Sequence, residues 1–376
     1  MQLRSIPRIF NNQVFLLVAL SIVAIGVFVL TRRVAAWDHR LEAKIAAIWY
    51  AEGQRLMTSG NIQEAVQAFR QAANDAYDNQ EYLLALANAL VASNHDAEAG
   101  QLLLRLREPD PENADINIYL ARLAAKQDKV DEAIHYYQNA LYGQWTGTHT
   151  DERRRELRTE LIHFLLQHQQ GELASSELLI LEGRIPDDAA SHISVAKLFL
   201  KAGDVRRAFN NYSAAAKLDS HNVEAQKGAG ETAFQLGDYS NAVEYLKSAL
   251  DLDPSLEKTQ QLLTLAQAVI AEDPLAPHLS AQERRTRLLD DFSRSLQRLQ
   301  SCLVQTTESK GVEQLQSLKA EAAAMQPKLE RSREFETVRA GAGLMFRMEE
   351  ASSAICGQGS PEDQALILLG HERIGL

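Results

Sequence analysis

The chain is short of the residue types on which many enzymes, secreted domains and nucleic-acid-binding proteins depend. Its 376 residues include two cysteines, Cys302 and Cys356, which excludes a disulfide-rich framework and a cysteine-based zinc cluster. Aromatic residues make up 6% of the chain, so its cores must be built mainly from small and aliphatic side chains. The formal net charge is −11, and basic residues are interleaved with acidic ones. A general nucleic-acid binder needs a clustered basic surface, so we expect no nucleic acid among the partners.

Long apolar runs are also missing, with one exception near the amino end. Residues 14–30 read "VFLLVALSIVAIGVFVL" and carry no charge. As a helix this run spans about 26 Å, close to the thickness of a bilayer core, and Thr31 extends it. A cleaved signal peptide is the alternative, but Arg32 and Arg33 separate the run from the small residues that would form a cleavage site. The sequence therefore predicts an uncleaved transmembrane helix at 14–31.

The segments that flank this helix bear on its orientation. A short cationic tail, 1–13, precedes it, and a juxtamembrane helix or linker, 32–45, follows it. The numbers of basic residues on the two sides of the helix do not favour either orientation under the positive-inside rule. A short cationic tail before an apolar run is typical of a signal anchor that leaves the tail in the cytoplasm. We expect a single-pass membrane protein with most of the chain outside the cytoplasm, on the periplasmic side.

The most informative feature is an internal repeat of 34 residues. "GDVRRAFNNYSAAAKLDS" at 203–220 recurs as "GDYSNAVEYLKSALDLDP" at 237–254. Each unit has a small residue, a second small residue twelve positions later and a large residue four positions after that. The first small positions are Gly53, Ala87, Ala121, Ala196 and Gly230; the second are Ala65, Ala99, Ala133, Ala208 and Ala242; the large ones are Phe69, Leu103, Tyr137, Tyr212 and Leu246.

Each repeated position has a physical reason. Small residues let two helices approach to about 8–10 Å, and the large residue fills the space beside the crossing. Gly60, Gly203 and Gly237 stand where a first helix would end, a place that often needs a left-handed backbone. One such hairpin cannot bury its own apolar face, so neighbouring units must stack. The pattern resembles the tetratricopeptide repeat, which implies a right-handed α-solenoid.

The repeat sets the expected domain boundaries. The solenoid covers 46–271, with five clear units, and its last helix at 257–271 is expected to solvate the open end. The segment 148–188 reads as a degenerate unit in which Ser176 replaces the expected alanine. It follows the insertion "GQWTGTHTDERRRE", whose mixed-charge part at 151–156 predicts a solvated helix start.

After the solenoid the 34-residue period is lost. A proline-containing stretch at 272–279 predicts a linker, and 280–376 a small helical domain. Its apolar residues recur at helical spacing in three runs, the second of which is expected to end at Pro327. Ser360 is a credible N-cap for a last helix. The expected fold class is all-α: an N-terminal transmembrane helix, a tetratricopeptide-type α-solenoid and a small C-terminal helical domain.

No catalytic or metal-binding motif stands out in the sequence. His163 and His168 are five residues apart, which places them on different helix faces rather than at the spacing of a helical metal pair. Gly341-Ala342-Gly343 follows a helical run instead of a strand, so helix packing or a kink explains it better than phosphate binding. We therefore expect no metal, no cofactor and no enzyme.

The resemblance implies a partner-binding groove along the first helices of the units. Mapped by register, its residues are Tyr50, Gln54, Asn88, Arg122, Lys197 and Lys227. They do not match the lysine-and-asparagine clamp with which some relatives hold a C-terminal carboxylate, because Gln54 and Leu84 stand at clamp positions. The three cations suit an acidic peptide. The plainer alternative, which we favour, is ordinary surface charge that Asp115, Glu224 and Glu231 partly balance.

Two further expectations concern the cysteines and the role of the protein. If the soluble part lies in an oxidising compartment, Cys302 and Cys356 should form a disulfide; the alternative is two buried thiols. The leading functional hypothesis is a membrane-anchored scaffold that recruits partner proteins through the solenoid. The alternative is a permanent subunit of a membrane complex. An enzyme with its chemistry in the C-terminal domain is the weakest hypothesis, and the fold alone does not choose among them.

Overall fold

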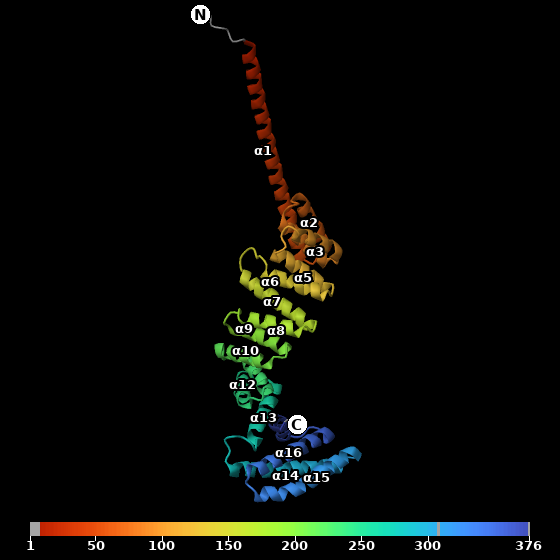
Figure 1. The fold of residues 1–376 in the computed structure, drawn as a ribbon, viewed down its shortest axis with the longest axis vertical. Helices are drawn as coiled ribbons and strands as arrows, with labels where there is room; N and C mark the ends of the chain where they lie inside the picture. Colours follow the sequence, from red (N-terminus) through yellow and green to blue (C-terminus); the bar gives the residue numbers. More distant parts are fainter. Residues whose placement is uncertain (1–7, 307–308, 375–376) are drawn as a thin grey trace. The chain divides into compact units, whose positions relative to one another are not determined.

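The computed structural model describes residues 8–306 and 309–374, and within these ranges the chain is helical, with no strand and one isolated bridge between Asn113 and Gln144. The all-α prediction is therefore confirmed. The chain divides into two compact units, Met1–His168 and Gln169–Leu376, which are described one at a time. In Figure 1 the helices of each unit follow one another as hairpins.

The first unit contains α1 (Arg8–Thr58), α2 (Ile62–Asp75), α3 (Gln80–Ala92), α4 (Asp96–Arg107), α5 (Ala114–Lys126), α6 (Val130–Tyr142) and α7 (Thr150–Gln167). The second contains α8 (Gly171–Glu182), α9 (Ala189–Lys201), α10 (Val205–Leu218), α11 (Val223–Gln235), α12 (Tyr239–Leu252), α13 (Glu257–Glu272), α14 (Ala281–Gln305), α15 (Ser309–Arg331), α16 (Phe335–Cys356) and α17 (Pro361–Ile374).

Helix α1 merges several of the predicted segments into one element. Its 51 residues include the predicted transmembrane helix, the juxtamembrane segment and the first helix of the first repeat, and it is about 77 Å long. The window Leu16–Arg33 has a mean hydropathy of 2.0, and none of it is buried in the protein. Part of the predicted cationic tail, residues 8–13, is helical, whereas residues 1–7 lie outside the described residues. The helix is a candidate anchor by length and composition, a test that a signal sequence also passes.

The repeated small and large residues occupy the helix crossings as the sequence predicts. The second small positions, Ala65, Ala99, Ala133, Ala208 and Ala242, are all completely buried. A Cβ atom on Gly53 would come within 2.6 Å of the Phe69 ring, and one on Gly230 within 2.6 Å of Leu246 Cγ. The large residue of each pair thus fills the space left by the missing side chain, which accounts for the small residue at the crossing.

The turns between paired helices carry the same period in their backbone. Gly60, Gly203 and Gly237 have φ angles of +82°, +82° and +74°, as the left-handed turn requires. Asn94, Asp128 and Gln169 take the equivalent left-handed positions with φ near +60° in the other hairpins: their angles are +63°, +58° and +59°. Along the sequence, each of these six residues follows the previous one by 34 positions, except that Gln169 follows Asp128 by 41 positions. One repeat is therefore seven residues longer than the others.

The seven extra residues fall in the loop 143–149 and in a longer α7, which has 18 residues where α5 and α9 have 13, and they explain why 148–188 reads as degenerate. When the register is shifted by seven, Ala174 stands 34 residues before Ala208, and it is completely buried. Leu178 then takes the large position and is also completely buried. The prediction that Ser176 replaces the repeated alanine was wrong, because Ser176 is exposed. The unit keeps the repeat pattern once the insertion is counted.

The segment after the repeats is packed rather than free. Helix α13 contacts α12 on one side and α17 on the other, so it does not simply solvate the end of the solenoid as expected. In the predicted linker 272–279, Ala276 and Leu279 are buried, and Asp273 accepts a hydrogen bond of 2.8 Å from Arg373 of α17. The prolines interrupt the helix there, but apolar contacts and this ion pair hold the segment in place.

Helices α14 to α17 share one apolar core, to which α13 adds Ala268 and Val269. The expected end of the second run at Pro327 was wrong, since α15 continues to Arg331. Pro327 is exposed, while Leu329 is buried two residues later and fastens the last turn. Arg285 of α14 donates a 3.0 Å hydrogen bond to the Leu329 carbonyl, which supplies a partner at a helix end that would otherwise lack one.

The remaining local predictions for this region are confirmed. Ser360 Oγ accepts a hydrogen bond from the Asp363 backbone N–H at the start of α17, as an N-cap does. A Cβ atom on Gly341 would lie 2.6 Å from a Leu329 methyl group, so this glycine allows α16 to pack closely on α15.

Candidate functional site

Each repeat is a pair of helices, and the first helices of the pairs in the first compact unit are α1, α3 and α5. These three helices present a row of aromatic and polar side chains. Tyr50 of α1 stacks on Tyr82 of α3 with 4.6 Å between ring centroids, and its hydroxyl donates a 2.8 Å hydrogen bond to Glu81. Burial, and then the hydrogen bond with Glu81, raise the pKa of Tyr50 to about 12. Gln54 of α1 and Asn88 of α3 are exposed beside this stack. We call Tyr50, Gln54, Tyr82, Asn88, Tyr119 and Arg122 the first-helix face.

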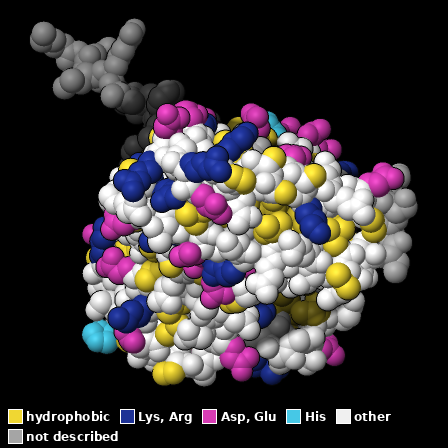
Figure 2. Space-filling model, turned by 90° about the horizontal axis from the view of Figure 1, so that it is seen from below, with side chains coloured by type: hydrophobic (Ala, Val, Ile, Leu, Met, Phe, Trp, Pro, Cys, Tyr) yellow, Lys and Arg dark blue, Asp and Glu magenta, His cyan; other side chains and the backbone are white. Residues whose placement is uncertain are grey.

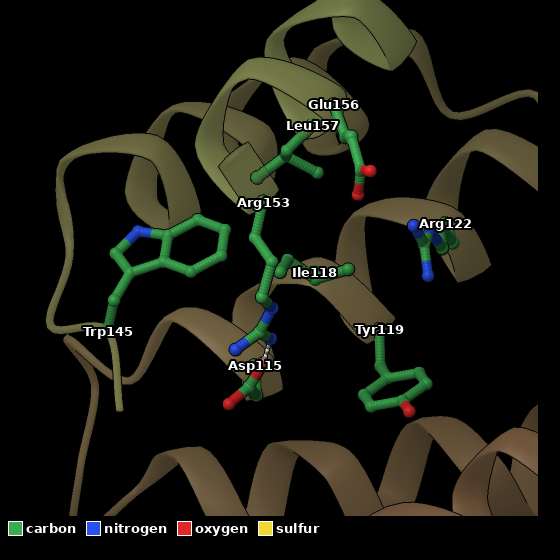
Figure 3. Close-up of a pocket in the computed structure, with 8 residues that line it drawn as sticks. All are labelled: Asp115, Ile118, Tyr119, Arg122, Trp145, Arg153, Glu156 and Leu157. Carbon is green, nitrogen blue, oxygen red and sulfur yellow. Dashed lines mark hydrogen bonds and ion pairs between the residues drawn. The ribbon is translucent and has the colours of Figure 1, made fainter. Parts of the chain in front are cut away.

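A small pocket of about 160 Å³ opens where α5 and α7 meet the inserted loop (Figure 3). Its walls are Asp115, Ile118, Tyr119 and Arg122 of α5, Trp145 of the loop, and Arg153, Glu156 and Leu157 of α7. The walls combine two aromatic rings, two guanidinium groups and two carboxylates. Burial raises the pKa of the Tyr119 phenol, so this ring stays uncharged at neutral pH.

The inserted loop is built to carry Trp145. Gln144 accepts a 3.0 Å backbone hydrogen bond from Ala114 and donates one of 2.7 Å to Glu112, which fastens the loop to the start of α5. A Cβ atom on Gly143 would lie 2.3 Å from the Glu112 carbonyl oxygen, so only glycine permits this approach. The Trp145 indole donates a 2.8 Å hydrogen bond to the Ala140 carbonyl. The ring is therefore held at the pocket wall.

The arginines of α7 do more than solvate a helix start. Arg153 forms an ion pair with Asp115, and its guanidinium lies 4.9 Å from the centre of the Trp145 ring. Figure 3 shows Arg153 pointing from α7 toward Asp115 on α5. Arg154 also lies over the ring, at 5.5 Å. The interpretation of 151–156 as the solvated start of a helix is confirmed for Asp151, Glu152 and Glu156, which are exposed, but it did not include the aromatic face that Trp145 offers to the two arginines.

Arg122 is held in a charged network at the other side of the pocket. Its guanidinium donates two hydrogen bonds to Glu160 of α7, at 2.9 and 2.7 Å, in a forked geometry. The Tyr137 hydroxyl donates a third to the same carboxylate at 2.8 Å. Burial pushes the pKa of Glu160 up, but these hydrogen bonds outweigh it and hold the pKa below its usual range. Glu160 thus stays ionised and fixes Arg122 in position.

The predicted groove residues are divided between the two units. Tyr50, Gln54, Asn88 and Arg122 lie in the first unit, whereas Lys197 and Lys227 lie in the second. Lys197 forms a 2.6 Å ion pair with Glu224, and Lys227 lies 3.7 Å from Glu231. These carboxylates are two of those expected to balance the cations, while Asp115 pairs with Arg153 instead of Arg122. Each predicted cation thus has an acidic neighbour.

Sequence reasoning missed the residues that build the pocket, namely Tyr119, Trp145 and Arg153. The available signal was a tryptophan inside an insertion, in a chain with three tryptophans in all. No group of three His, Cys, Asp or Glu residues in the described part of the chain is placed to hold a metal ion. On the face that Figure 2 shows, basic and acidic side chains are interspersed.

The two cysteines lie in a different region, at the ends of α14 and α16. The structure joins Cys302 to Cys356 by a disulfide, with 5.8 Å between their Cα atoms. Cys302 is buried and Cys356 is exposed. The oxidation state in the cell follows from the compartment, so the expectation of an oxidised pair outside the cytoplasm stays a prediction.

Comparison with known proteins identifies the repeat. Tetratricopeptide-repeat models match residues 56–123, 101–147 and 196–257. Among curated proteins, DnaJ homolog subfamily C member 3 of Bos taurus is 22% identical over 273 residues, covering 66% of this chain and 54% of the relative. The Homo sapiens protein of the same name gives the same identity and coverage. The chain spans about half the length of these curated relatives.

Two solved structures match part of this chain. The tetratricopeptide protein YrrB, described with an unusual peptide-binding site, is 19% identical, with a TM-score of 0.39 over 52% of this chain and 97% of its own. PilF of Pseudomonas aeruginosa is 17% identical, with a TM-score of 0.40 over 58% of this chain and 97% of its own. Similarities at this level carry no argument about the fold or the function of this chain. With the period, the buried crossings and the matched models, residues 56–147 and 196–257 of this chain are tetratricopeptide repeats.

Proposed function

We propose that this protein is a membrane-anchored, non-catalytic scaffold that binds partner proteins through the first-helix face of its first unit. Tetratricopeptide repeats are a protein-interaction fold, and stacked units create extended binding surfaces. The observation that carries the proposal is the row formed by the Tyr50–Tyr82 stack and the adjoining pocket around Tyr119. Aromatic rings beside fixed ion pairs are the composition that protein interfaces favour.

The proposed anchor is the apolar part of α1. The window Leu16–Arg33 is long enough to cross a bilayer, and its apolar side chains have no partner within the described residues that buries them. A soluble protein would leave these side chains in water. Arg32 and Arg33 follow the apolar run directly, where they suit the headgroup region of a membrane.

We also propose that the repeats lie outside the cytoplasm, on the periplasmic side. The placement of Cys302 and Cys356, whose Cα atoms lie 5.8 Å apart, supports this, because two cysteines close enough to pair suit an oxidising compartment. Mass spectrometry of protein alkylated in its native membrane, without reduction, should find both thiols blocked by the bond. Two alkylated thiols would place this part of the chain in a reducing compartment.

Two pairs of exposed residues allow a matched test of the binding surface. Gln54 and Asn88 lie on first helices, 34 residues apart, whereas Gln67 and Gln101 lie on second helices with the same separation. All four are exposed, so arginine at any of them should leave the repeat core intact. Partners purified with the tagged full chain from gently solubilised membranes should be lost from Gln54→Arg/Asn88→Arg and retained by Gln67→Arg/Gln101→Arg.

The same purification separates the proposed scaffold from the alternative role. Variable, substoichiometric partners support a scaffold that recruits clients, and a single stoichiometric companion supports a permanent subunit of a membrane complex. Equal recovery of partners by the two double variants would remove the first-helix face as the binding surface. Purification of the chain without any companion would contradict both roles.

A further inference from the structure

An apolar stripe runs along α1 between the proposed anchor and the first repeat. Trp37, Leu41, Ile45 and Ile48 are 67%, 43%, 39% and 67% exposed. Their spacings of four, four and three residues place them on one side of the helix. Side chains of this size rarely gather in water on one helix face without a partner.

The stripe follows a heptad that extends through the whole apolar part of α1. One set of positions, seven residues apart, is Leu20, Val27, Val34, Leu41 and Ile48; the other is Leu16, Val23, Leu30 and Trp37. Inside the predicted membrane span this pattern means little, because nearly every residue there is apolar. Between residues 34 and 48 it is informative, since charged residues occupy other positions of the heptad. We call the two sets of heptad positions together the seam. Lys44 is the one charged residue on the seam, and the apolar side chain of Ile45 is next to it.

The repeat packs on the opposite side of the same helix. Ala46 lies half a turn away from Trp37 around the helix and is completely buried, and α1 packs against α2. After Ile48 the next two heptad positions are Ala51 and Arg55, so the apolar seam ends where the repeat begins. The stripe is therefore not a part of the repeat core that happens to be exposed.

A second copy of this chain fits the stripe better than another occupant. The anchor would hold every copy with the same direction and depth, which is the arrangement of a parallel coiled coil. In a parallel coiled coil, the residue directly before a core residue on one helix faces a residue of the partner helix. That partner residue stands five positions further along the sequence. Arg33 and Asp38 occupy these two positions and carry opposite charges. Two copies would thus pair their charges while burying their stripes.

We propose that residues 34–48 of α1 form a parallel two-stranded coiled coil that makes this protein a dimer. The inference rests on the membrane anchoring proposed above. It would place two solenoids side by side at the membrane, so that each dimer offers two first-helix faces. Partners with two binding segments would gain apparent affinity from this arrangement.

Single cysteines in the full-length chain test the seam directly in membranes. Leu41→Cys and Ile48→Cys lie on the proposed seam, and Ala43→Cys is exposed on the far side of the helix. After mild oxidation, we expect roughly tenfold more disulfide-linked dimer from the seam variants than from Ala43→Cys, because only the seam brings identical positions together. The unsubstituted chain, treated in the same way, measures any background from Cys302 and Cys356.

Two outcomes would overturn the dimer. They are equal cross-linking at the seam and at Ala43→Cys, or no cross-linking at any position. Extraction of the same membranes at alkaline pH separates this failure from a failure of the anchor. Protein that stays in the membrane but does not cross-link contradicts the coiled coil alone, whereas protein that is released contradicts the anchoring itself.

A charge introduced at the seam gives a second measurement that does not depend on thiol chemistry. Leu41→Asp should abolish the dimer in analytical ultracentrifugation of the detergent-solubilised chain, and Ala43→Asp should leave it unchanged. Both positions are exposed, so circular dichroism should report the same helix content for the two variants. A Leu41→Asp chain that remains dimeric would contradict the proposed seam.

Discussion

The repeats α9–α12 and the bundle α14–α17 belong to the same unit but are held together differently. In the repeats, contacts are apolar and small: Gly230 receives Leu246, and Ala242 is completely buried. Charges stay outside, as in the Lys197–Glu224 pair, whose side chains are 50% and 55% exposed. Stability is therefore spread over many similar contacts, each of modest size.

The bundle, by contrast, buries charged side chains and is closed by a covalent bond. Glu349 of α16 is completely buried and forms an ion pair with Arg298 of α14. The disulfide joins Cys302, four residues after Arg298, to Cys356, seven residues after Glu349. Asp291 is also buried and shares Arg294 with Glu272 of α13. The bundle thus depends on a few partners, and losing one of them should matter more than losing one repeat contact.

The largest expected effect comes from breaking the buried ion pair. Arg298→Met would leave the Glu349 carboxylate without its cation in the bundle core, at a cost of about 3–5 kcal/mol. Hydrogen exchange of the full chain should show this loss in peptides from α14–α17 and much less in α9–α12. Lys197→Met is the matched control, and its exposed pair should contribute no more than about 1 kcal/mol. Equal losses in the two variants would contradict the comparison.

The buried acids should make the bundle less stable as pH rises. Burial, and then the neighbouring Glu272, raise the pKa of Asp291 to about 8, while Arg294 and Arg287 oppose the shift. The folded chain therefore keeps a proton that the unfolded chain releases near pH 4, so this contribution is complete below pH 4 and is lost as pH rises through 8.

Asp291→Asn tests that pH dependence. The variant should show a flatter dependence of bundle stability between pH 4 and pH 8, measured by thermal unfolding at several pH values. Asp290→Asn, one residue earlier on an exposed part of α14, is the control and should keep the slope of the unsubstituted chain. An unchanged slope in Asp291→Asn would assign the pH dependence to other groups.

Removal of the disulfide should come next in size. The bond closes a loop with a sequence separation of 54, so its loss should destabilise the bundle by about 2–4 kcal/mol. Reduction with a phosphine should lower protection against hydrogen exchange at the ends of α14 and α16 while leaving α9–α12 unchanged. A bundle that responds no more than the repeats do would show that packing alone holds these helix ends.

Within the repeats, a single methyl group should have a smaller but measurable effect. Gly230→Ala would place a Cβ atom 2.6 Å from Leu246 Cγ and 3.0 Å from the Leu246 backbone nitrogen, which should cost about 1–3 kcal/mol. Gly171 stands at a helix start with open space around it, so Gly171→Ala should instead raise the free energy of unfolding by about 0.4–1 kcal/mol. Thermal melts that rank these two variants in the reverse order would contradict the assigned helix crossing.

Much of the repeat region could be predicted because each position recurs with the same physical role. Gly53, Gly230 and the buried alanines follow from the closest helix approach, and Gly60 follows from its left-handed turn. The register of α8 was missed because the loop 143–149 and the longer α7 add seven residues to the period, so Ser176 was taken for the repeated position that Ala174 occupies. Periodicity detects a position only as long as the spacing is unbroken.

The pocket and the bundle could not be predicted from the sequence period, for a different reason. Arg153 and Trp145 interact because a loop folds back, and Arg298 meets Glu349 across 51 residues of sequence. Such pairs depend on tertiary placement, which composition and spacing do not encode. Pro327 was misleading in a similar way, since burial of Leu329 and the hydrogen bond from Arg285 outweigh the local tendency of proline to end a helix.

The central claim is that the first helices of the first unit bind partner proteins and the second helices do not. A photo-crosslinking amino acid at Asn88 of α3, and separately at Gln101 of α4, tests this on the full chain in its native membrane, since both positions are exposed. The account predicts discrete cross-linked adducts with partner proteins at position 88 and none at position 101. The same adducts at both positions, or adducts at position 101 alone, would contradict it.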